Sequence, residues 1–353
     1  MRCTVLLACL AAVGVGSSSF AQAPAGAPAA PIAPATPIAV VKDLYAAFER
    51  GDVQHIDALL TPDTVWTFHA PPHVVPYAGT YKGKDGVREF FTRVSSTIDV
   101  REIGQRQFIQ ENDTLAVVGW ERSVARETGG EFYAEWLHLF TIRAGQIARF
   151  EEFTDSAAIA AALAPADTER GRAYYTTCAG CHGTAAQGNS GMHAPNLTPL
   201  DDAYLLRQLR HFAHDIRGGA QDFYGWQMNG RAKALPDDRA LRDVVAYIET
   251  LPETLSRATL QGDEVHGKAL YASCVGCHGA QGRGNVAVGA PALAGLDDWY
   301  LVEQLESFAN GTRGAHKEDS SGAQMRAAAA GLQSQDARRD VIAYIATFKG
   351  NGQ

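Results

Sequence analysis

The feature that most restricts the fold of this chain is an internal repeat in its second half. A shift of 96 residues superimposes the run CAGCHG at 178–183 on CVGCHG at 274–279, and DDAYLLRQL on DDWYLVEQL. One residue is gained later in the second copy, so Met228 matches Met325 at an offset of 97. Each copy has helical patterns at both ends and Gly-rich loops between them. The repeat therefore predicts a duplicated α-helical unit of about 90 residues.

The first residues of the chain have the pattern of a cleavable export signal. Arg2 supplies a short positive region, the apolar run Val5–Val15 follows, and small residues permit cleavage after Ala21. A lipoprotein signal at Cys9 is the alternative, because LLAC ends at that cysteine. No other apolar stretch of the sequence is long enough to span a bilayer. We therefore expect a signal peptide over residues 1–21 and a soluble, periplasmic mature protein.

Charge and cysteine content narrow the classes of function. The formal net charge is −8, and removal of Arg2 with the signal makes the mature chain more acidic. An acidic protein is poorly suited to nucleic acid or to an anionic membrane surface. The signal also removes two of the six cysteines, so the mature chain keeps four, all within the two C-x-x-C-H motifs.

Four chemistries compete for a C-x-x-C-H motif: zinc binding, thiol–disulfide exchange, a short disulfide and covalent haem attachment. Zinc is disfavoured because the cysteine pairs lie in separate repeats, and adjacent Cys and His residues would struggle to ligate one tetrahedral ion. A catalytic dithiol expects a βαβ setting, which the helical, Gly-rich surroundings do not supply. C-x-x-C-H is the attachment signature of c-type haem, with both sulfurs and the imidazole on one helical turn. The expected haem anchors are Cys178, Cys181, Cys274 and Cys277, and the expected proximal iron ligands are His182 and His278.

Matched methionines identify the candidate second ligands of the two irons. Met228 lies 46 residues after the first motif histidine, and Met325 lies 47 after the second. Met192 has no counterpart, because Val288 occupies the matching position. A methionine is more often core filler, but two matched positions in a Met-poor chain favour ligation. The remaining histidines of the first repeat and His316 lack matched partners, which is typical of surface or structural residues.

These motifs resemble the class I cytochromes c, specifically the periplasmic tandem dihaem type (c4-like). The likeness implies two all-α cytochrome c domains, at 166–260 and 261–353, each with a covalently bound haem c and His/Met ligation of its iron. It implies that Pro195 and Pro291 support the proximal histidines. It also implies that Arg217 and Arg313 pair with haem propionates, with a solvated surface position as the alternative. Filled axial positions suit electron transfer with redox partner proteins, such as a dehydrogenase donor or an oxidase acceptor.

A different kind of domain precedes the repeat. Residues 22–37 read as an Ala/Pro-rich linker. Residues 38–163 then predict two short helices, a strand, a third helix and four β-rich runs, which is an α+β domain with antiparallel strands. The stretches LYAAFERGDVQHIDALLTPDTVW and EWLHLFTIRAGQIARFEEFTD resemble the SnoaL-like branch of the NTF2-like superfamily, a cone around a pocket. This likeness implies ligand binding, dimerisation or partner docking.

The chemistry of this first domain is less clear from the sequence. Ketosteroid-isomerase-like relatives carry a catalytic carboxylate on the first strand, where this chain has Thr67, so isomerase chemistry is in doubt. Alternation on the run EFYAEWLHLF places Trp136, His138 and Phe140 on one face. A His138/Asp155 acid–base pair is one hypothesis, and a buried polar contact is the other.

The sequence as a whole predicts an exported dihaem electron-transfer cytochrome with an NTF2-like domain. The first alternative is a redox enzyme whose NTF2-like pocket turns over a small apolar substrate and passes electrons to the haems. The second is a haem peroxidase or gas sensor, which needs an open coordination site on iron. A homodimer and a small apolar ligand are among the expected partners of the NTF2-like domain.

Overall fold

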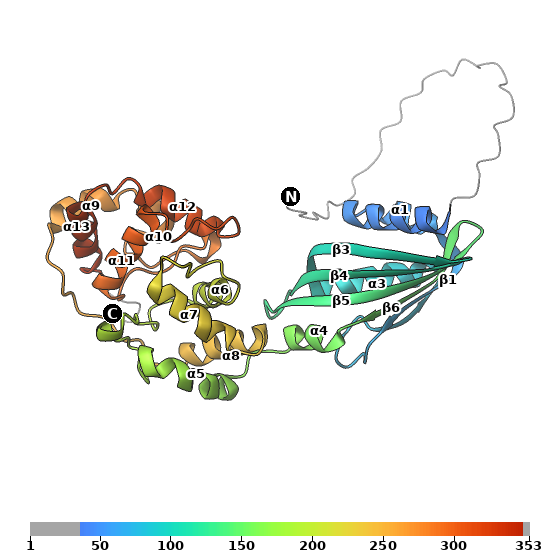
Figure 1. Cartoon of the computed structure of the whole chain (residues 1–353), viewed down its shortest axis with the longest axis horizontal. Coiled ribbons are helices and arrows are strands. Elements are labelled where there is room, and N and C mark those ends of the chain that lie inside the picture. The colour runs from blue at the N-terminus through green and yellow to red at the C-terminus, as the bar shows by residue number, and fades with distance from the viewer. Residues whose placement is uncertain (1–35, 349–353) are drawn as a thin grey trace, which may run out of the picture. The chain divides into compact units, whose positions relative to one another are not determined.

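The computed structural model of the chain describes residues 36–348 (Figure 1). The expected signal peptide and residues 22–35 of the expected linker lie outside this range. No helix in the described part of the chain is long and apolar enough to cross a membrane. The chain divides into two compact units, Met1–Leu163 and Ala164–Gln353, and each unit has its own hydrophobic core.

The N-terminal unit is an α+β domain built on one six-stranded sheet (Figure 1). The strand order is β2-β1-β6-β5-β4-β3, with β1 and β6 parallel and every other neighbouring pair antiparallel. In chain order its elements are α1 (Pro37–Arg50), α2 (Val53–Leu59), β1 (Leu60–His69), β2 (Gly79–Lys82), α3 (Gly83–Thr97), β3 (Ile98–Glu111), β4 (Thr114–Ala125), β5 (Glu131–Arg143), β6 (Gln146–Thr154) and α4 (Ser156–Leu163).

The boundaries of these elements follow from local chemistry. The Thr36 side chain accepts a hydrogen bond from the backbone N–H of Ala39 and so caps the start of α1. Gly51, at φ +67°, ends the same helix in the left-handed conformation that glycine adopts without strain. Ala144 and Gly145 both have positive φ, as a tight two-residue hairpin between β5 and β6 requires.

The core of this unit lies between the inner face of the sheet and the helices α1 and α3. Aromatic rings from both layers meet there, among them Trp66 of β1, Phe90 of α3 and Phe150 of β6. The alternation predicted for β5 is confirmed, because Trp136 and His138 are buried while the intervening Leu137 is exposed. The sheet therefore presents its large apolar and aromatic side chains to one enclosed interior.

Two elements and one strand pairing were not predicted. The short strand β2 and the helix α4 carry weak patterns of their own, and both are stabilised by packing against the sheet. The sequence also favoured antiparallel pairing throughout, whereas β1 lies parallel to β6. The segment after β1, which includes α3, separates β1 in the chain from strands β3 to β6. The last of these strands, β6, then packs beside β1 in the sheet.

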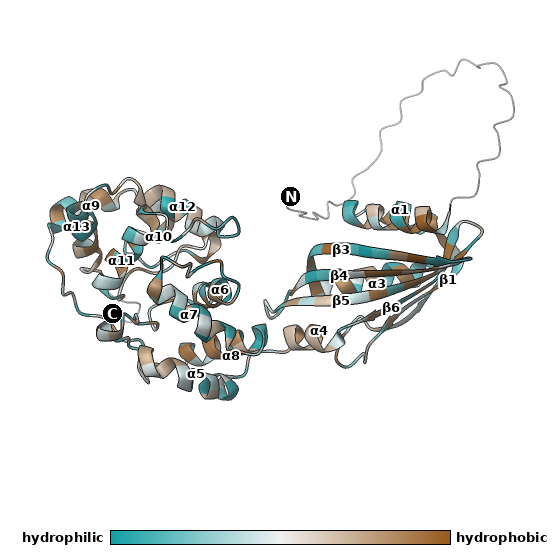
Figure 2. Ribbon diagram, in the orientation of Figure 1, coloured by the Kyte–Doolittle hydropathy of each residue, from teal (hydrophilic) through white to brown (hydrophobic). Residues whose placement is uncertain are grey.

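The C-terminal unit is all-helical and consists of two similar halves (Figure 1). Its helices carry both apolar and polar residues, as Figure 2 shows. The first half comprises α5 (Thr168–His182), η1 (Ser190–Met192), α6 (Asp202–Ala213), α7 (Phe223–Lys233) and α8 (Asp238–Glu249). The second comprises α9 (Glu264–Tyr271), α10 (Val275–His278), η2 (Val286–Val288), α11 (Asp298–Ala309), α12 (Ser320–Ala329) and α13 (Gln335–Ile345).

A glycine permits the crossing of the first and last helices in each half. A Cβ atom added to Gly171 would lie 1.9 Å from the backbone oxygen of Asp243 in α8. A Cβ atom added to Gly267 would lie at the same distance from the backbone oxygen of Asp340 in α13. Real Cβ atoms do not approach a backbone oxygen this closely, so only glycine allows these two helix backbones to touch.

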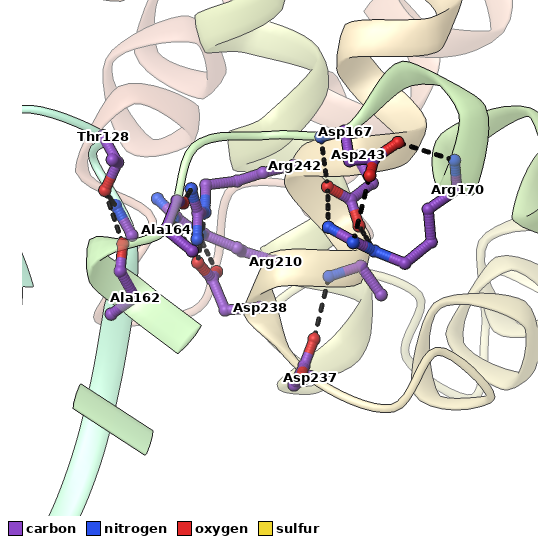
Figure 3. Close-up of polar contacts among 12 residues, drawn as sticks. Thr128, Ala162, Ala164, Asp167, Arg170, Arg210, Asp237, Asp238, Arg242 and Asp243 are labelled. Carbon is purple, nitrogen blue, oxygen red and sulfur yellow. Dashed lines mark hydrogen bonds and ion pairs between the residues drawn. The ribbon is translucent and has the colours of Figure 1, made fainter. Parts of the chain in front are cut away.

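Polar contacts at the start of the C-terminal unit fix its first helix (Figure 3). The fully buried carboxylate of Asp243 accepts a hydrogen bond from the backbone N–H of Asp167 at 2.7 Å. It also accepts two hydrogen bonds from the Arg170 guanidinium. Arg242 donates to the backbone oxygen of Ala164 at 2.8 Å. The second half repeats the clamp, since Asp340 accepts a bond from the backbone of Asp263.

Candidate functional sites

The first C-x-x-C-H motif lines a cavity of about 730 Å³. Helix α5 places Cys178, Cys181 and His182 on this cavity, as residues three and four apart on a helix share a face. Met228 of α7 lies on the wall of the same cavity. The structure therefore brings together the four residues that the sequence nominates for the first haem.

The second motif lines a cavity of about 170 Å³, and the same types of motif side chain and a methionine line it as line the first cavity. Its walls include the motif side chains Cys274, Cys277 and His278, together with Met325 of α12. All four motif cysteines are free thiols, so none is consumed by a disulfide. The two cavities match in donor set, although the first is wider.

Each motif histidine is oriented by the backbone of a proline. His182 donates a hydrogen bond from Nδ1 to the carbonyl oxygen of Pro195 at 2.9 Å, and His278 makes the same bond to Pro291. Because Nδ1 carries the hydrogen, Nε2 keeps its lone pair for a metal. Burial lowers the pKa of both imidazoles, and the proline carbonyls oppose this only in part. A neutral, oriented imidazole is the form that binds iron.

Two buried arginines join the two halves of the unit. Arg217 donates to Oε1 of Gln208 at 2.7 Å and to Oε1 of Gln304 in the other half at 2.8 Å. Arg313 donates to the same two oxygens, at 2.9 Å and 2.6 Å, and to the Tyr204 hydroxyl. Burial opposes ionisation of Tyr204, but the two guanidinium charges outweigh it and lower the pKa of the hydroxyl. The solvated alternative for these arginines is therefore wrong.

The cavities fit a haem with two propionates. Within the described residues, the Nε atoms of Arg217 and Arg313 are both buried without a hydrogen-bond acceptor. Arg313 lines the second cavity and Arg217 the first. Two buried cations with unused donors beside the motif cysteines and histidines call for anionic groups at these positions. The propionates of a covalently attached haem meet that requirement.

The N-terminal unit has a separate, aromatic-lined cavity of about 80 Å³. His138 lies on its wall, with Nδ1 2.8 Å from the hydroxyl of Tyr45 and Nε2 3.5 Å from Oε2 of Glu152. The predicted His138/Asp155 pair is not formed. Asp155 is exposed at the start of α4 and accepts bonds from the backbone N–H groups of Ala157 and Ala158.

The register between β5 and β6 explains which carboxylate lies beside His138. His138 of β5 lies directly opposite Glu152 of β6, and alternation turns both side chains inward. Sequence reasoning missed a second cavity residue, Glu121 of β4, which is 7% exposed. Its signal was a lone acid among the otherwise uncharged inward positions of β4. Burial and the charge of Glu152 raise the pKa of Glu121 to about 7.

The position equivalent to the isomerase carboxylate faces away from this cavity. Thr67 contacts the hydroxyl of Thr80 on β2, while its neighbours Trp66 and Phe68 line the interior. The carboxylates of the cavity instead come from β4 and β6. Any chemistry in this domain must therefore use a different set of residues.

Comparison with known proteins agrees with both units. The protein-family model for a SnoaL-like domain matches residues 41–150, and the model for cytochrome c matches 168–252 and 265–349. The cytochrome c4 of Azotobacter vinelandii is 30% identical over 199 residues, covering 53% of this chain and 90% of that protein. A thiosulfate dehydrogenase electron acceptor from Thiomonas intermedia strain K12 is 30% identical over 165 residues, covering 42% of this chain and 70% of that protein. Among solved structures, an NTF2-like protein from Burkholderia thailandensis is 32% identical, with a TM-score of 0.35, and covers 37% of this chain and 99% of that chain.

The repeat, the paired C-x-x-C-H motifs and the matched relatives lead to one assignment. The predicted fold class is confirmed, with an NTF2-like α+β domain followed by two helical cytochrome c domains. The protein carries two covalently bound haem c groups and serves dihaem electron transfer. The chain belongs to the cytochrome c4 family and carries a SnoaL-like domain ahead of its two cytochrome domains.

Proposed function

We propose that each haem iron is bound by one histidine and one methionine, and each haem is anchored by two thioethers. Three observations support this: the motif residues and one matched methionine share each cavity, each imidazole is oriented by a proline carbonyl, and the four thiols are free. The axial pairs are His182 with Met228 and His278 with Met325. The thioether pairs are Cys178 with Cys181 and Cys274 with Cys277.

This ligand set selects electron transfer over catalysis at iron. When bound, a haem with both axial positions occupied exchanges single electrons and has no position left for oxygen or peroxide. The protein's own residues orient the proximal imidazoles, neutralise the propionates and exclude water from the cavities. Peroxidase and gas-sensing functions require an open position and are therefore not proposed.

The wall between the two cavities supports transfer from one haem to the other. Five side chains line both cavities, so only this single layer separates them: Leu200, Tyr204, Gln208, Tyr300 and Gln304. The arginine–glutamine contacts described above hold this layer together from both sides. We propose that these five side chains would lie between the two haems when both are bound and would set the distance for electron transfer between them.

The compartment and partners follow from the same proposal. We assign the mature protein to the periplasm, supported by the export-signal pattern of residues 1–21 and by the c-type haem motifs. The similarity to a protein named for accepting electrons from thiosulfate dehydrogenase supports a dehydrogenase as donor. A terminal oxidase is the proposed acceptor. The proposed domain limits are 38–163 for the SnoaL-like domain, and 166–260 and 261–353 for the cytochrome domains.

Of the roles open to the SnoaL-like domain, binding of a small molecule agrees best with its structure. Its interior holds a cavity with buried polar groups, which is the arrangement of a ligand site. Dimerisation or partner docking would use its outer surface and needs no such cavity. The Tyr45–His138–Glu152 contacts favour one second candidate, in which this pocket turns over a small substrate and the haems remove the electrons.

A reductive titration of the exported protein tests the electron-transfer proposal. The wild-type chain should take up two electrons, and its haem content should be two per chain. A Cys178→Ala/Cys181→Ala variant should keep one haem and accept one electron. The control Thr176→Val, at an exposed position outside the cavity, should change neither value. One haem or none in the wild-type chain would contradict the proposal. Reduction by a small substrate without an added dehydrogenase would favour the enzymatic candidate.

A further inference from the structure

The cavity of the SnoaL-like domain has walls made largely of aromatic rings. Trp66 stacks on Phe150 at 3.8 Å between ring centroids, and Trp136 stacks on His138 at 3.7 Å. The other aromatic residues of the wall are Tyr45, Phe48, Phe68, Tyr77, Phe90, Phe91 and Phe140. The volume of about 80 Å³ is roughly half that of an engineered cavity that binds benzene. A fitting ligand therefore has only a few heavy atoms.

Two carboxylates share this small space. Glu121 accepts a hydrogen bond from the hydroxyl of Ser123 at 2.9 Å, and Oε2 of Glu152 lies 3.5 Å from Nε2 of His138. The described residues that line the cavity include no lysine or arginine. The imidazole of His138 lies between the hydroxyl of Tyr45, 2.8 Å from Nδ1, and Oε2 of Glu152, 3.5 Å from Nε2.

The burial of two neighbouring carboxylates has a measurable electrostatic consequence. Burial of a carboxylate without a counter-ion favours its protonated form, and a second carboxylate nearby adds to the effect. Both causes act on Glu121 and raise its pKa. Burial raises the pKa of the Tyr77 hydroxyl, and the charges of Glu121 and Glu152 raise it further. A bound cation would therefore offset the charge that these two carboxylates carry when ionised.

The side chains that line the cavity indicate which kind of cation would bind there. A metal ion requires several oxygen or nitrogen ligands, and no group of three or more His, Cys, Asp or Glu side chains suited to a metal exists among residues 36–348. Aromatic faces instead attract organic cations through their quadrupoles. Methyl groups suit the rings, and a single N–H donor suits a carboxylate. We propose that this cavity binds a small methylated ammonium ion, held between the aromatic rings and the carboxylates of Glu121 and Glu152.

This inference rests on the proposed ligand-binding role of the domain and adds the class of ligand. It assigns distinct tasks to the residues on the wall. Glu152, positioned by His138, and Glu121, positioned by Ser123, balance the charge of the ammonium group. Trp66 and Trp136 supply ring faces for its methyl groups.

Calorimetric titration of the full-length holoprotein at pH 8 tests this inference with three probes of equal heavy-atom number. Trimethylammonium, acetone and acetate carry charges of +1, 0 and −1 on similar shapes. Trimethylammonium should bind with saturating heat, and the two other probes should bind at least about tenfold more weakly. Glu121→Gln and Glu152→Gln, which keep side-chain volume, should each weaken trimethylammonium by about tenfold or more.

The matched control is Glu135→Gln, an exposed glutamate on the outer face of β5. It should leave the affinity unchanged, and unaltered circular dichroism of each variant confirms that the domain is folded. Equal or tighter binding of acetone or acetate would overturn the ligand class while leaving a ligand-binding role. Binding of none of the three probes would overturn both. Unchanged trimethylammonium affinity in both Gln variants would overturn the assigned site.

Discussion

Arg217 in one cytochrome domain donates a hydrogen bond to Oε1 of Gln304 in the other, and that oxygen also accepts a bond from Arg313. The mirror arrangement exists at Gln208, which accepts from both arginines as well. Two neutral amide oxygens thus bridge two buried guanidinium groups across the interface. The contact lets two like charges lie close together beside both haem sites.

Removal of one bridging oxygen should destabilise the interface. Gln304→Leu leaves donors on both buried arginines without an acceptor, so the free energy of unfolding should fall by about 3 kcal/mol. Guanidinium chloride unfolding followed by haem absorption measures the effect. Gln333→Leu, at an exposed position, should stay within about 0.5 kcal/mol of wild type. Equal unfolding midpoints for the two variants would show that the bridge contributes nothing.

Replacement of the glycine at the helix crossing of each cytochrome domain by any residue with a side chain should destabilise that domain. Gly171→Ala places a Cβ against the backbone oxygen of Asp243, so we expect a loss of about 3 kcal/mol or more in the free energy of unfolding. Gly267→Ala should behave alike, because the geometry is repeated. Gly219→Ala is the control, since nothing lies within 4 Å of the added atom. A wild-type unfolding curve for Gly171→Ala would refute this explanation of the glycine.

Much of this architecture was predictable because its signals are local or repeated. The three helices, the strand and the four β-rich runs expected before the repeat all form, because β-branched and aromatic side chains and turn residues mark them locally. The parallel pairing of β1 with β6 was not predictable, because it depends on how distant segments pack. For the same reason the sequence suggested Asp155 as the partner of His138, whereas strand register selects Glu152. The buried bridge between the arginines likewise depends on the packing of two domains.

The buried carboxylate of Glu121 should make the SnoaL-like domain less stable as pH rises. Its pKa is about 7 in the folded domain, against an ordinary value of 4.5, so the folded form alone holds a proton between these values. Stability should therefore fall as pH rises from about 4.5 to about 7, by about 3 kcal/mol in total, and stay low above pH 7. Glu121→Gln should remove this loss.

Scanning calorimetry of the full chain between pH 5 and pH 8 measures this dependence. The transition of the SnoaL-like domain should fall by on the order of 10 °C in the wild-type chain and remain nearly level in Glu121→Gln. Glu135→Gln, whose carboxylate is exposed, should retain the wild-type dependence. A pH dependence that persists in Glu121→Gln would assign the effect to another group.

The ferric charge-transfer absorption of a Met-ligated haem tests the central proposal most directly. Met228→Ala and Met325→Ala should each remove about half of this band, and the double variant all of it, because each chain has one such ligand per haem. Met192→Ala is the matched control: Met192 also lines the first cavity but is half exposed and unmatched in the second domain, so the band should be retained in full. Full intensity in the double variant, or loss of the band in Met192→Ala, would contradict His/Met ligation by the residues assigned here.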